Sequence, residues 1–345
     1  MRAAALKAAA IVAKEVRATR AANRGRPLTI ADALTDYAAA RAGKASHAAM
    51  VAHGARAAGF LGGSKPLRDL APADLEQLIA ERVADGCSPQ TIAHELGVLR
   101  AATRYAAGLG HQVPTTLLAG SWRLPPRTMK TRYLSVEEYR AVILAMDPER
   151  TLANGKKPGV AMVQQRTAAR DLAVILAMTG MRWTEAAKMT WGQVDLVNNN
   201  IRVWGFKGQR ERVAPLPTVA VAVIHRRLQD MHARGVALEA HSPVFSSAAS
   251  RESTGFRSSA SCKPILQAME ECGLNNPVSV ARYGRATAHS LRHTFASLLL
   301  QNGAALAEVQ EALGHATMHM TRRYAHLSQG AASARLGSIL DGVHS

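Results

Sequence analysis

The hydrophobic pattern of residues 28–118 predicts a region made of helices. Three segments there have apolar residues at helical spacing and end at or near a glycine: 28–43, 71–86 and 88–110. In the third segment, Ile92, Leu96 and Leu99 fall on one face at i, i+4 and i+7. Ser88 stands where the cap of that helix belongs. We therefore expect these helices to pack around one apolar core.

A basic stretch stiffened by proline interrupts this pattern. Pro125 and Pro126 forbid a continuous helix, and residues 119–132 contain no acidic residue. The helical pattern then resumes with Ser135 and Glu138, which have the spacing of a capping box. The chain is expected to have four parts: a basic N-terminal arm over 1–27, a helical domain over 28–118, a basic linker over 119–132, and a second domain over 133–345 that ends in a tail over 328–345.

Helical patterns dominate the second domain, with one exception. Residues 198–217 alternate polar and apolar positions around a turn of Gly, Lys and Gln, which predicts a β-hairpin. Two stretches without periodicity, 150–166 and 246–262, are expected to be loops. The predicted fold is therefore mainly α, with a small antiparallel β-sheet or hairpin in the second domain.

Composition narrows the range of partners. A chain of 345 residues with 48% hydrophobic positions is long and apolar enough for two folded domains. Its formal net charge of +18 indicates a polyanionic partner, nucleic acid first and an anionic membrane surface second. The sequence has no apolar run of ~20 residues, so a membrane-spanning helix is not expected. Three cysteines without a CxxC pair are typical of a reduced cytoplasmic compartment.

The stretch MTGMRWTEAAKM, residues 178–189, predicts the end of one helix and the start of another. Gly180 suits the left-handed conformation that closes a helix, and Thr184 is expected to cap the next one. Arg182 then lies near a helix N-terminus, where free N–H groups attract an anionic oxygen. Glu185 is placed to hold this guanidinium, although an ordinary surface ion pair explains the same spacing.

Two further motifs carry groups that move protons. Lys207 lies at the tip of the predicted hairpin, where a lysine is usually only solvated but could also reach into a site. On the predicted helix AHSLRHTFASLLLQNG, His289 and Arg292 are three residues apart and can face the same way. His289 and His293 could instead bind zinc, but Ser290 occupies the position where a zinc-protease helix has glutamate. We interpret His293 as a structural residue.

The last motif, LGHATMHMTRRYAHL, contains a tyrosine among histidines and arginines. His315 follows Gly314 in a turn, and Thr317 can cap a further helix that would turn Tyr324 back towards the rest of this motif. Alone, such a tyrosine would be a packing residue. Combined with two arginines to clamp a phosphodiester, and with a lysine and histidines to move protons, it could attack phosphorus. A phenol with a pKa of about 10 needs a base and positive surroundings to do so.

These motifs, in this order, closely resemble the tyrosine recombinases, or phage integrases. The resemblance covers TGMRWTEAAKMTWGQVDL, GFKGQRERVAPLP, HSLRHTFAS and LGHATMHMTRRYAHL, and runs from about residue 133 to 327. It implies an α+β tyrosine-recombinase catalytic domain over 133–345. The upstream helical region is similar to the family's core-binding (SAM-like) DNA domain.

The resemblance implies a role for each matching residue. Arg182 and Arg292 hold the scissile phosphate, with Glu185 as an orienting group. Tyr324 is the nucleophile that forms a 3′-phosphotyrosyl link, and Lys207 protonates the leaving 5′-oxygen. His289 assists proton transfer and His315 hydrogen-bonds the phosphate. Neither a cofactor nor a metal is implied.

The family resemblance also implies the partners. They are double-stranded DNA and other copies of the chain in a homotetramer on paired sites, with a DNA-bending accessory protein as a further candidate. No membrane is expected, and the expected location is the bacterial cytoplasm at the nucleoid. The expected role is site-specific integration and excision of a mobile genetic element. The basic residues expected to contact DNA are Arg100, Arg104, Arg123, Arg127, Lys130, Arg132, Arg322 and Arg323.

Four alternatives remain at this point. One is a catalytically silent DNA-binding protein on the same fold, which the intact set of catalytic residues disfavours. Another is an Xer-like resolvase, which shares the motifs. A type IB topoisomerase uses similar chemistry, but the forms LGH and HSLRH disfavour it. A metal hydrolase built on the histidines would lose its activity in EDTA.

Overall fold

The computed structural model describes residues 26–327 except positions 45, 121, 127–130, 152–153, 205–210, 234, 236 and 246–261. The chain divides into two compact units, residues 1–129 and 130–345. The division falls inside the stretch 119–132 for which a linker is predicted. Within the described part, every helix is too short or too polar to span a membrane. The predicted N-terminal arm, apart from its last two residues, and the predicted tail lie outside it.

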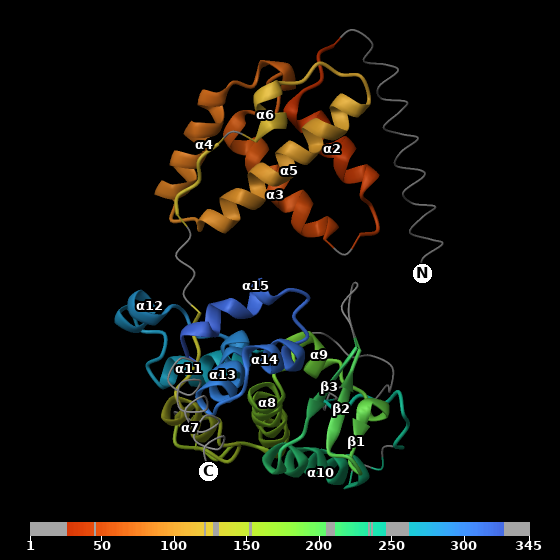
Figure 1. Ribbon diagram of the computed structural model, residues 1–345, viewed down its shortest axis with the longest axis vertical. Coiled ribbons are helices and arrows are strands. Elements are labelled where there is room, and N and C mark those ends of the chain that lie inside the picture. The colour runs from red at the N-terminus through yellow and green to blue at the C-terminus, as the bar shows by residue number, and fades with distance from the viewer. Residues whose placement is uncertain are drawn as a thin grey trace, which may run out of the picture. The chain divides into compact units, whose positions relative to one another are not determined.

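The first unit is a bundle of helices around α5 (Figure 1). Its elements are α2 (Ile30–Ala40), α3 (His47–Leu61), η1 (Leu67–Asp69), α4 (Pro72–Ala84), α5 (Pro89–Gly108) and α6 (Thr115–Ala119). The side chain of Ser88 accepts the N–H of Thr91 at the start of α5, which confirms the predicted cap. Ile92, Leu96 and Leu99 are fully buried, which confirms the apolar face predicted for this helix.

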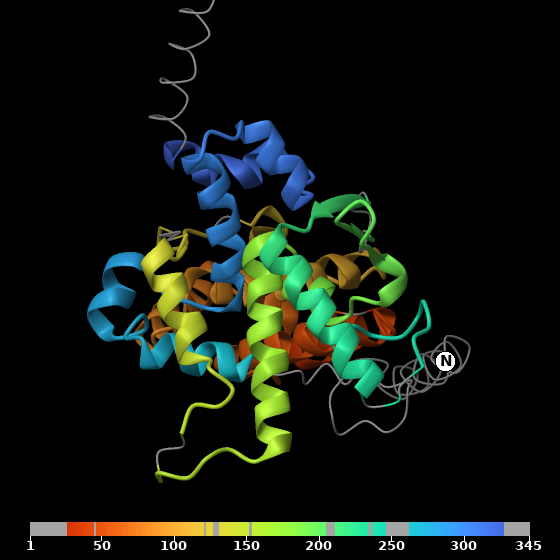
Figure 2. The same cartoon turned by 90° about the horizontal axis from the view of Figure 1, so that it is seen from below.

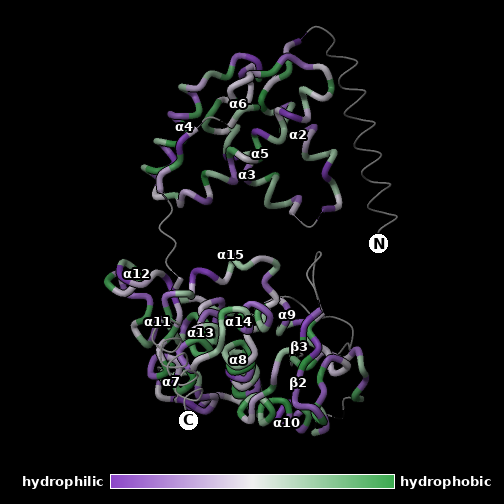
Figure 3. The backbone as a smooth tube through the Cα atoms, viewed as in Figure 1, coloured by the Kyte–Doolittle hydropathy of each residue, from purple (hydrophilic) through white to green (hydrophobic). Residues whose placement is uncertain are grey.

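The second unit surrounds the long helix α8. Its elements are α7 (Val136–Ala145), α8 (Val160–Thr179), α9 (Trp183–Ala187), η2 (Trp191–Gln193), β1 (Val194–Asp195), β2 (Asn200–Val203), β3 (Arg212–Pro215), α10 (Thr218–Ala233), α11 (Lys263–Glu271), α12 (Pro277–Tyr283), α13 (Ala288–Gln301), α14 (Leu306–Leu313), α15 (Met318–Thr321) and η3 (Arg322–Leu327). In Figure 2, α8 lies between α7 and α10. Helix α13 packs against α8 as well. Figure 3 shows hydrophilic and hydrophobic positions interspersed along the helices of both units.

The predicted hairpin is present, and it carries a third strand that the pattern did not indicate. Strands β1, β2 and β3 form one antiparallel sheet in that order, with Ile201 opposite Ala214. The tip of the hairpin, which includes Lys207, lies outside the described residues. Ser135 and Glu138 form the predicted capping box at the start of α7.

The loop predicted over 150–166 is partly wrong, because α8 already begins at Val160. The first turn of α8, residues 160–163, is apolar but largely exposed, and the next turn, residues 164–167, is polar. This start therefore lacks the periodic apolar stripe that marks a packed helix. Most of the other predicted loop, 246–262, lies outside the described residues.

Because α8 is buried, the same leucine-to-alanine change should affect stability very differently on α8 and on the exposed face of α7. Leu176 on α8 is 1% exposed and belongs to the main core, whereas Leu144 on α7 is 71% exposed. We expect Leu176→Ala to lower the free energy of unfolding by about 2–5 kcal/mol, because it leaves a cavity. The same change at Leu144 should cost less than about 0.5 kcal/mol. Urea unfolding followed by circular dichroism measures both, and equal losses would contradict this placement of α8.

Candidate active site

The turn between α8 and α9 positions Arg182. Gly180 closes α8 in the left-handed conformation, with φ of 62°, as predicted. The residue at the N-cap of α9 is Arg182 itself, so the prediction that Thr184 is the cap is wrong. The carboxylate of Glu185, three residues on, accepts the backbone N–H of Arg182 at 2.8 Å, which is the bond that a glutamate at this position makes in a capping box.

Glu185 lies between two guanidinium groups. Its carboxylate accepts from Arg182 Nη1 at 2.8 Å, the pair predicted from their spacing, and from Arg212 Nη2 at 2.7 Å. Burial alone would raise the pKa of Glu185, whose side chain is 5% exposed. The hydrogen bond and charge of Arg212, with the hydrogen bonds from Arg182, outweigh burial and lower this pKa to about 2. The carboxylate is therefore charged at neutral pH.

Sequence analysis missed Arg212. It lies on β3 at the edge of the hairpin, where its side chain is buried, and its Nε also donates to the carbonyl of Ala312 at 3.0 Å. Arg212 therefore links the sheet to both α9 and the end of α14. Strand alternation was the signal available: Arg212 has the same phase as the buried Ala214, so an inward side chain was indicated.

Arg292 is the most deeply placed charge of the site. Its side chain extends from α13 and is 2% exposed; Nη1 donates to the carbonyl of Gly180 and Nη2 to the carbonyl of Leu313, each at 2.6 Å. Burial, and then the positive charges of Arg182 and Arg212, lower the pKa of Arg292 to about 9. A guanidinium in such surroundings is stabilised by an anion that binds beside it.

Two histidines of the site, His289 and His315, have lowered pKa values. Burial, and then the charges of Arg292 and Arg182, lower the pKa of His315 to about 4. His315 Nδ1 lies 2.8 Å from the hydroxyl of the buried Thr321. Burial, and then the positive charges of Arg292 and Arg182, also lower the pKa of His289. Neutral imidazoles accept as well as donate hydrogen bonds.

Tyr324, on η3, is 2% exposed and packs with α13 and α14. Burial raises its pKa, an effect that the positive charges of Arg323 and Arg292 partly offset. Its hydroxyl is in hydrogen-bond contact with Nδ1 of His293. The interpretation of His293 as a structural residue therefore has a functional alternative, because its imidazole touches the candidate nucleophile.

The structure thus brings together six of the residues singled out in the sequence. They are Arg182, Glu185, His289, Arg292, His315 and Tyr324. His289 and His293, weighed above as zinc ligands, lie ring edge against ring face with centroids 4.6 Å apart. Among the described residues, no three His, Cys, Asp or Glu side chains are grouped as metal ligands are.

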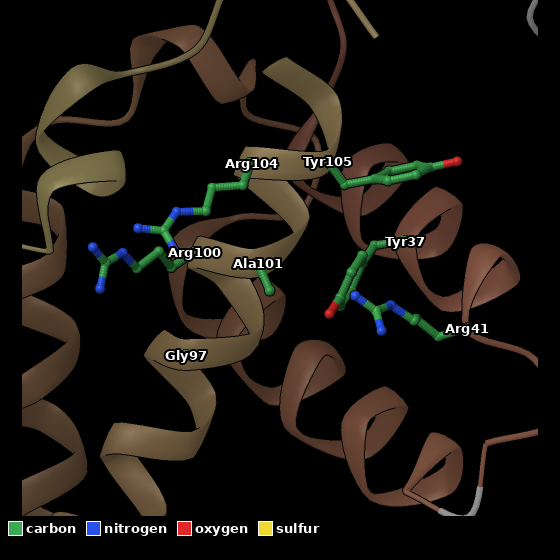
Figure 4. A pocket seen from close by; sticks show the side chains of 7 residues that line it. All are labelled: Tyr37, Arg41, Gly97, Arg100, Ala101, Arg104 and Tyr105. Atoms are coloured by element: carbon green, nitrogen blue, oxygen red, sulfur yellow. The ribbon is translucent and has the colours of Figure 1, made fainter. Parts of the chain in front are cut away.

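The candidate DNA-binding residues lie in different surroundings. Arg100 on α5 donates to the carbonyls of Leu118 and Ala119, and it borders a hollow of about 520 Å³ together with Arg104, Arg41, Tyr37 and Tyr105 (Figure 4). Exposed positions are Arg104, Arg123, Arg322 and Arg323.

Arg132 differs from the other basic candidates because it is buried. Its guanidinium pairs with Glu138 at 2.7 Å and lies over the ring of Tyr283. These contacts within the protein give Arg132 a structural role that does not involve DNA. Its contact with DNA stays a prediction. Arg127 and Lys130 lie outside the described residues.

Comparison with known proteins agrees with this geometry. The model of the phage integrase family matches residues 152–330. The tyrosine recombinase XerC of Rhizobium meliloti (strain 1021) is 30% identical over 293 residues, which are 83% of this chain and 81% of that relative. The chain belongs to the phage integrase family, the tyrosine-type site-specific recombinases. The tyrosine recombinase XerD of Staphylococcus haemolyticus is 26% identical over 74% of this recombinase and 78% of its own length.

Solved structures share the fold of this recombinase. The Tn1549 transposon integrase in complex with a circular intermediate DNA aligns with a TM-score of 0.65 and 18% identity, covering 90% of this chain and 99% of that one. A lambda integrase dimer bound to a COC′ core site aligns with a TM-score of 0.66 and 17% identity, covering 89% and 80%.

The turn at Gly180 predicts a large effect of a single methyl group. A Cβ on Gly180 would lie 2.4 Å from a ring carbon of Phe295, whereas a Cβ on Gly155, whose φ of 75° is also positive, would meet no atom within 4 Å. We expect Gly155→Ala to cost about 1 kcal/mol of unfolding free energy from backbone strain alone. Gly180→Ala should cost several kcal/mol, since strain and a clash add. Urea unfolding compares the two variants, and similar losses would contradict the tight packing.

The low pKa of Glu185 predicts a pH-dependent contribution to stability. A carboxyl whose pKa falls from about 4.5 to about 2 on folding stabilises the protein fully above about pH 4.5, and this stability is lost as pH falls towards 2. Glu185→Gln should therefore cost roughly 3 kcal/mol at pH 7. The difference between wild type and variant should shrink from pH 5 to the lowest pH at which both still fold. Urea unfolding at several pH values tests this, and a constant difference would speak against the charged pair.

Proposed function

We propose that this recombinase cleaves and rejoins DNA through a covalent bond between Tyr324 and a 3′-phosphate. Arg182 and Arg292 would clamp the non-bridging oxygens of the scissile phosphodiester and stabilise charge in the transition state. The surroundings of Arg292 support this: its guanidinium is buried, and its pKa is lowered to about 9 by burial and neighbouring arginines. Binding of a phosphodiester anion there would relieve both effects.

The other side chains have complementary roles in the proposed reaction. Glu185 holds the Arg182 guanidinium in place. His315, neutral and oriented by Thr321, donates a hydrogen bond to the phosphate. His289 assists proton transfer, and Lys207 protonates the 5′-oxygen that leaves as the Tyr324–phosphorus bond forms. One phosphodiester is exchanged for another, so religation is the same step in reverse.

The observation that carries this proposal is the place of the Tyr324 hydroxyl. It contacts an imidazole of the helix that also holds Arg292, and the charges of Arg292 and Arg323 act on it. A tyrosine that served only in packing would not need a base and two positive charges around its hydroxyl. The same arrangement disfavours a silent DNA-binding protein, because none of the described residues of the catalytic set is replaced.

The substrate we infer is double-stranded DNA, bound by a homotetramer on paired sites. The net charge of +18 and the relation to integrases in complex with DNA support this substrate. Basic groups around the hollow on α5, among them Arg104 and Arg41, would contact the backbone (Figure 4). A DNA-bending accessory protein, a cytoplasmic location and association with the nucleoid belong to the same proposal.

Integration and excision of a mobile element is the cellular role we favour. The fold shared with a transposon integrase and with lambda integrase supports it. An Xer-like resolvase is the second candidate, because XerC and XerD proteins are among the relatives. Recombination assayed between DNA flanking the gene and between paired chromosomal sites would separate the two roles.

The proposed nucleophile predicts a covalent adduct. Wild type, incubated without metal on recombination-site DNA nicked beside the scissile phosphate, should become linked to the DNA and be retained on a denaturing gel. Tyr324→Phe removes only the hydroxyl, so it should bind the same DNA with similar affinity and form no detectable adduct. An adduct in the variant would rule out Tyr324 as nucleophile. Binding without any adduct in wild type would favour the silent DNA-binding protein.

A further inference from the structure

We propose that His293 takes the proton of Tyr324 during cleavage, keeps it while the DNA is covalently bound, and returns it during religation. This inference rests on the proposed function, because it assigns the proton acceptor of the same reaction. The resemblance to the family assigns assistance in proton transfer to His289, one helical turn earlier on α13.

His289 and His293 differ in whether they contact the Tyr324 hydroxyl. Nδ1 of His293 is in hydrogen-bond contact with the Tyr324 hydroxyl, and the two ring centroids lie 5.7 Å apart. His289 packs its ring against His293, with centroids 4.6 Å apart and an angle of 83° between the rings. The imidazole that touches the reacting oxygen is therefore that of His293, with His289 against it.

The charges around His293 make its protonation depend on the substrate. Burial, then His289, Arg323, Arg292 and His315, lower the pKa of His293 to about 3. These charged groups come from α13, from η3 and from the turn between α14 and α15. His293 itself contacts the Tyr324 hydroxyl and the His289 ring. In the free protein His293 is therefore neutral and can accept a hydrogen bond at Nδ1 when its own hydrogen is on Nε2.

A bound phosphodiester changes this balance. Its negative charge, placed between the two arginines, offsets the share of the lowered pKa that neighbouring charges add to burial, and so raises the affinity of Nδ1 for a proton. The same charge would disfavour a free phenolate, so the proton must leave Tyr324 as the bond to phosphorus forms. Proton acceptance is thus coupled to the presence of DNA, and an idle enzyme keeps its nucleophile protonated.

The step balances without any further reactant. In cleavage the Tyr324 proton moves to His293 Nδ1, the bond between the tyrosine oxygen and phosphorus forms, and the bond to the 5′-oxygen breaks. That oxygen takes a proton from Lys207. In religation the 5′-hydroxyl gives its proton back to Lys207 and attacks phosphorus, and the departing tyrosine oxygen recovers its proton from His293.

The first test compares variants on two substrates. In His293→Asn the amide occupies roughly the place of Nδ1 and can still hydrogen-bond the tyrosine, but it cannot hold a proton. We expect adduct formation on the nicked substrate to slow by about 10²-fold or more in His293→Asn and in His293→Ala, the usual contribution of a general base. His225→Asn on α10, an exposed histidine, should react like wild type.

The second substrate carries sulfur in place of the bridging 5′-oxygen. A thiolate leaves without needing a proton, so this substrate should restore Lys207→Ala but not His293→Asn. If His293→Asn reacts within about threefold of wild type, a margin far below the effect of a general base, or if sulfur restores it, the proposal is wrong. Failure of wild type itself to form an adduct would instead contradict the proposed function.

A measurement on the wild-type protein covers the case in which both variants unfold. With ¹⁵N-labelled histidine, the ring nitrogens of His293 report its protonation before and after the adduct is trapped on the nicked DNA. We expect a neutral imidazole in the free protein and an imidazolium in the adduct at pH 7. An imidazole that stays neutral in the adduct would overturn the proposal, because the proton would then be elsewhere.

Discussion

The site depends on two hydrogen bonds that the Arg292 guanidinium donates. It joins two turns that are far apart in the sequence, because its two terminal nitrogens bind the carbonyls of Gly180 and Leu313. One turn presents Arg182 and the other leads to His315. A guanidinium donates in a fixed planar fork, so lysine could not hold both carbonyls in this way. The residue that would bind the phosphate therefore also fixes the places of its neighbours.

This arrangement concentrates positive charge where little water is present. Glu185 neutralises part of it, being shared by Arg182 and Arg212, and it keeps both side chains in place. Arg292 is bound mainly to carbonyl groups, so its charge is less fully compensated. The free protein thus holds a destabilised charge that a phosphodiester would stabilise, and that difference can be used to bind DNA at one phosphate.

Local signals in the sequence predicted the framework well. Glycine at 180 and 314, serine at 88 and the Ser135–Glu138 pair mark helix ends by chemistry that operates within a few residues. The Arg182–Glu185 pair belongs to the same class. Thr184 was mistaken for a cap because a threonine before an acidic helix start is a common signal, while here a glutamate at the third position serves Arg182.

The contacts that sequence analysis could not predict are those between distant segments. Arg212 meets Glu185, 27 positions earlier, and Ala312, 100 positions later, and no local pattern specifies either distance. His293 looked structural because it follows Arg292 on a helix with a strong apolar stripe. Only the placement of Tyr324, 31 residues on, shows what its imidazole faces.

The same excess of positive charge acts on the three histidines His289, His293 and His315. Each of them has a lowered pKa, and for each of them arginine charges add to burial as a cause. A histidine beside a carboxylate would be protonated more easily and would bind the tyrosine proton even in an idle enzyme. Burial and the arginines together keep the imidazoles neutral, and a bound anion would offset the share due to the arginines. The proposed phosphate clamp and the proposed control of the Tyr324 proton would therefore depend on the same arginine charges.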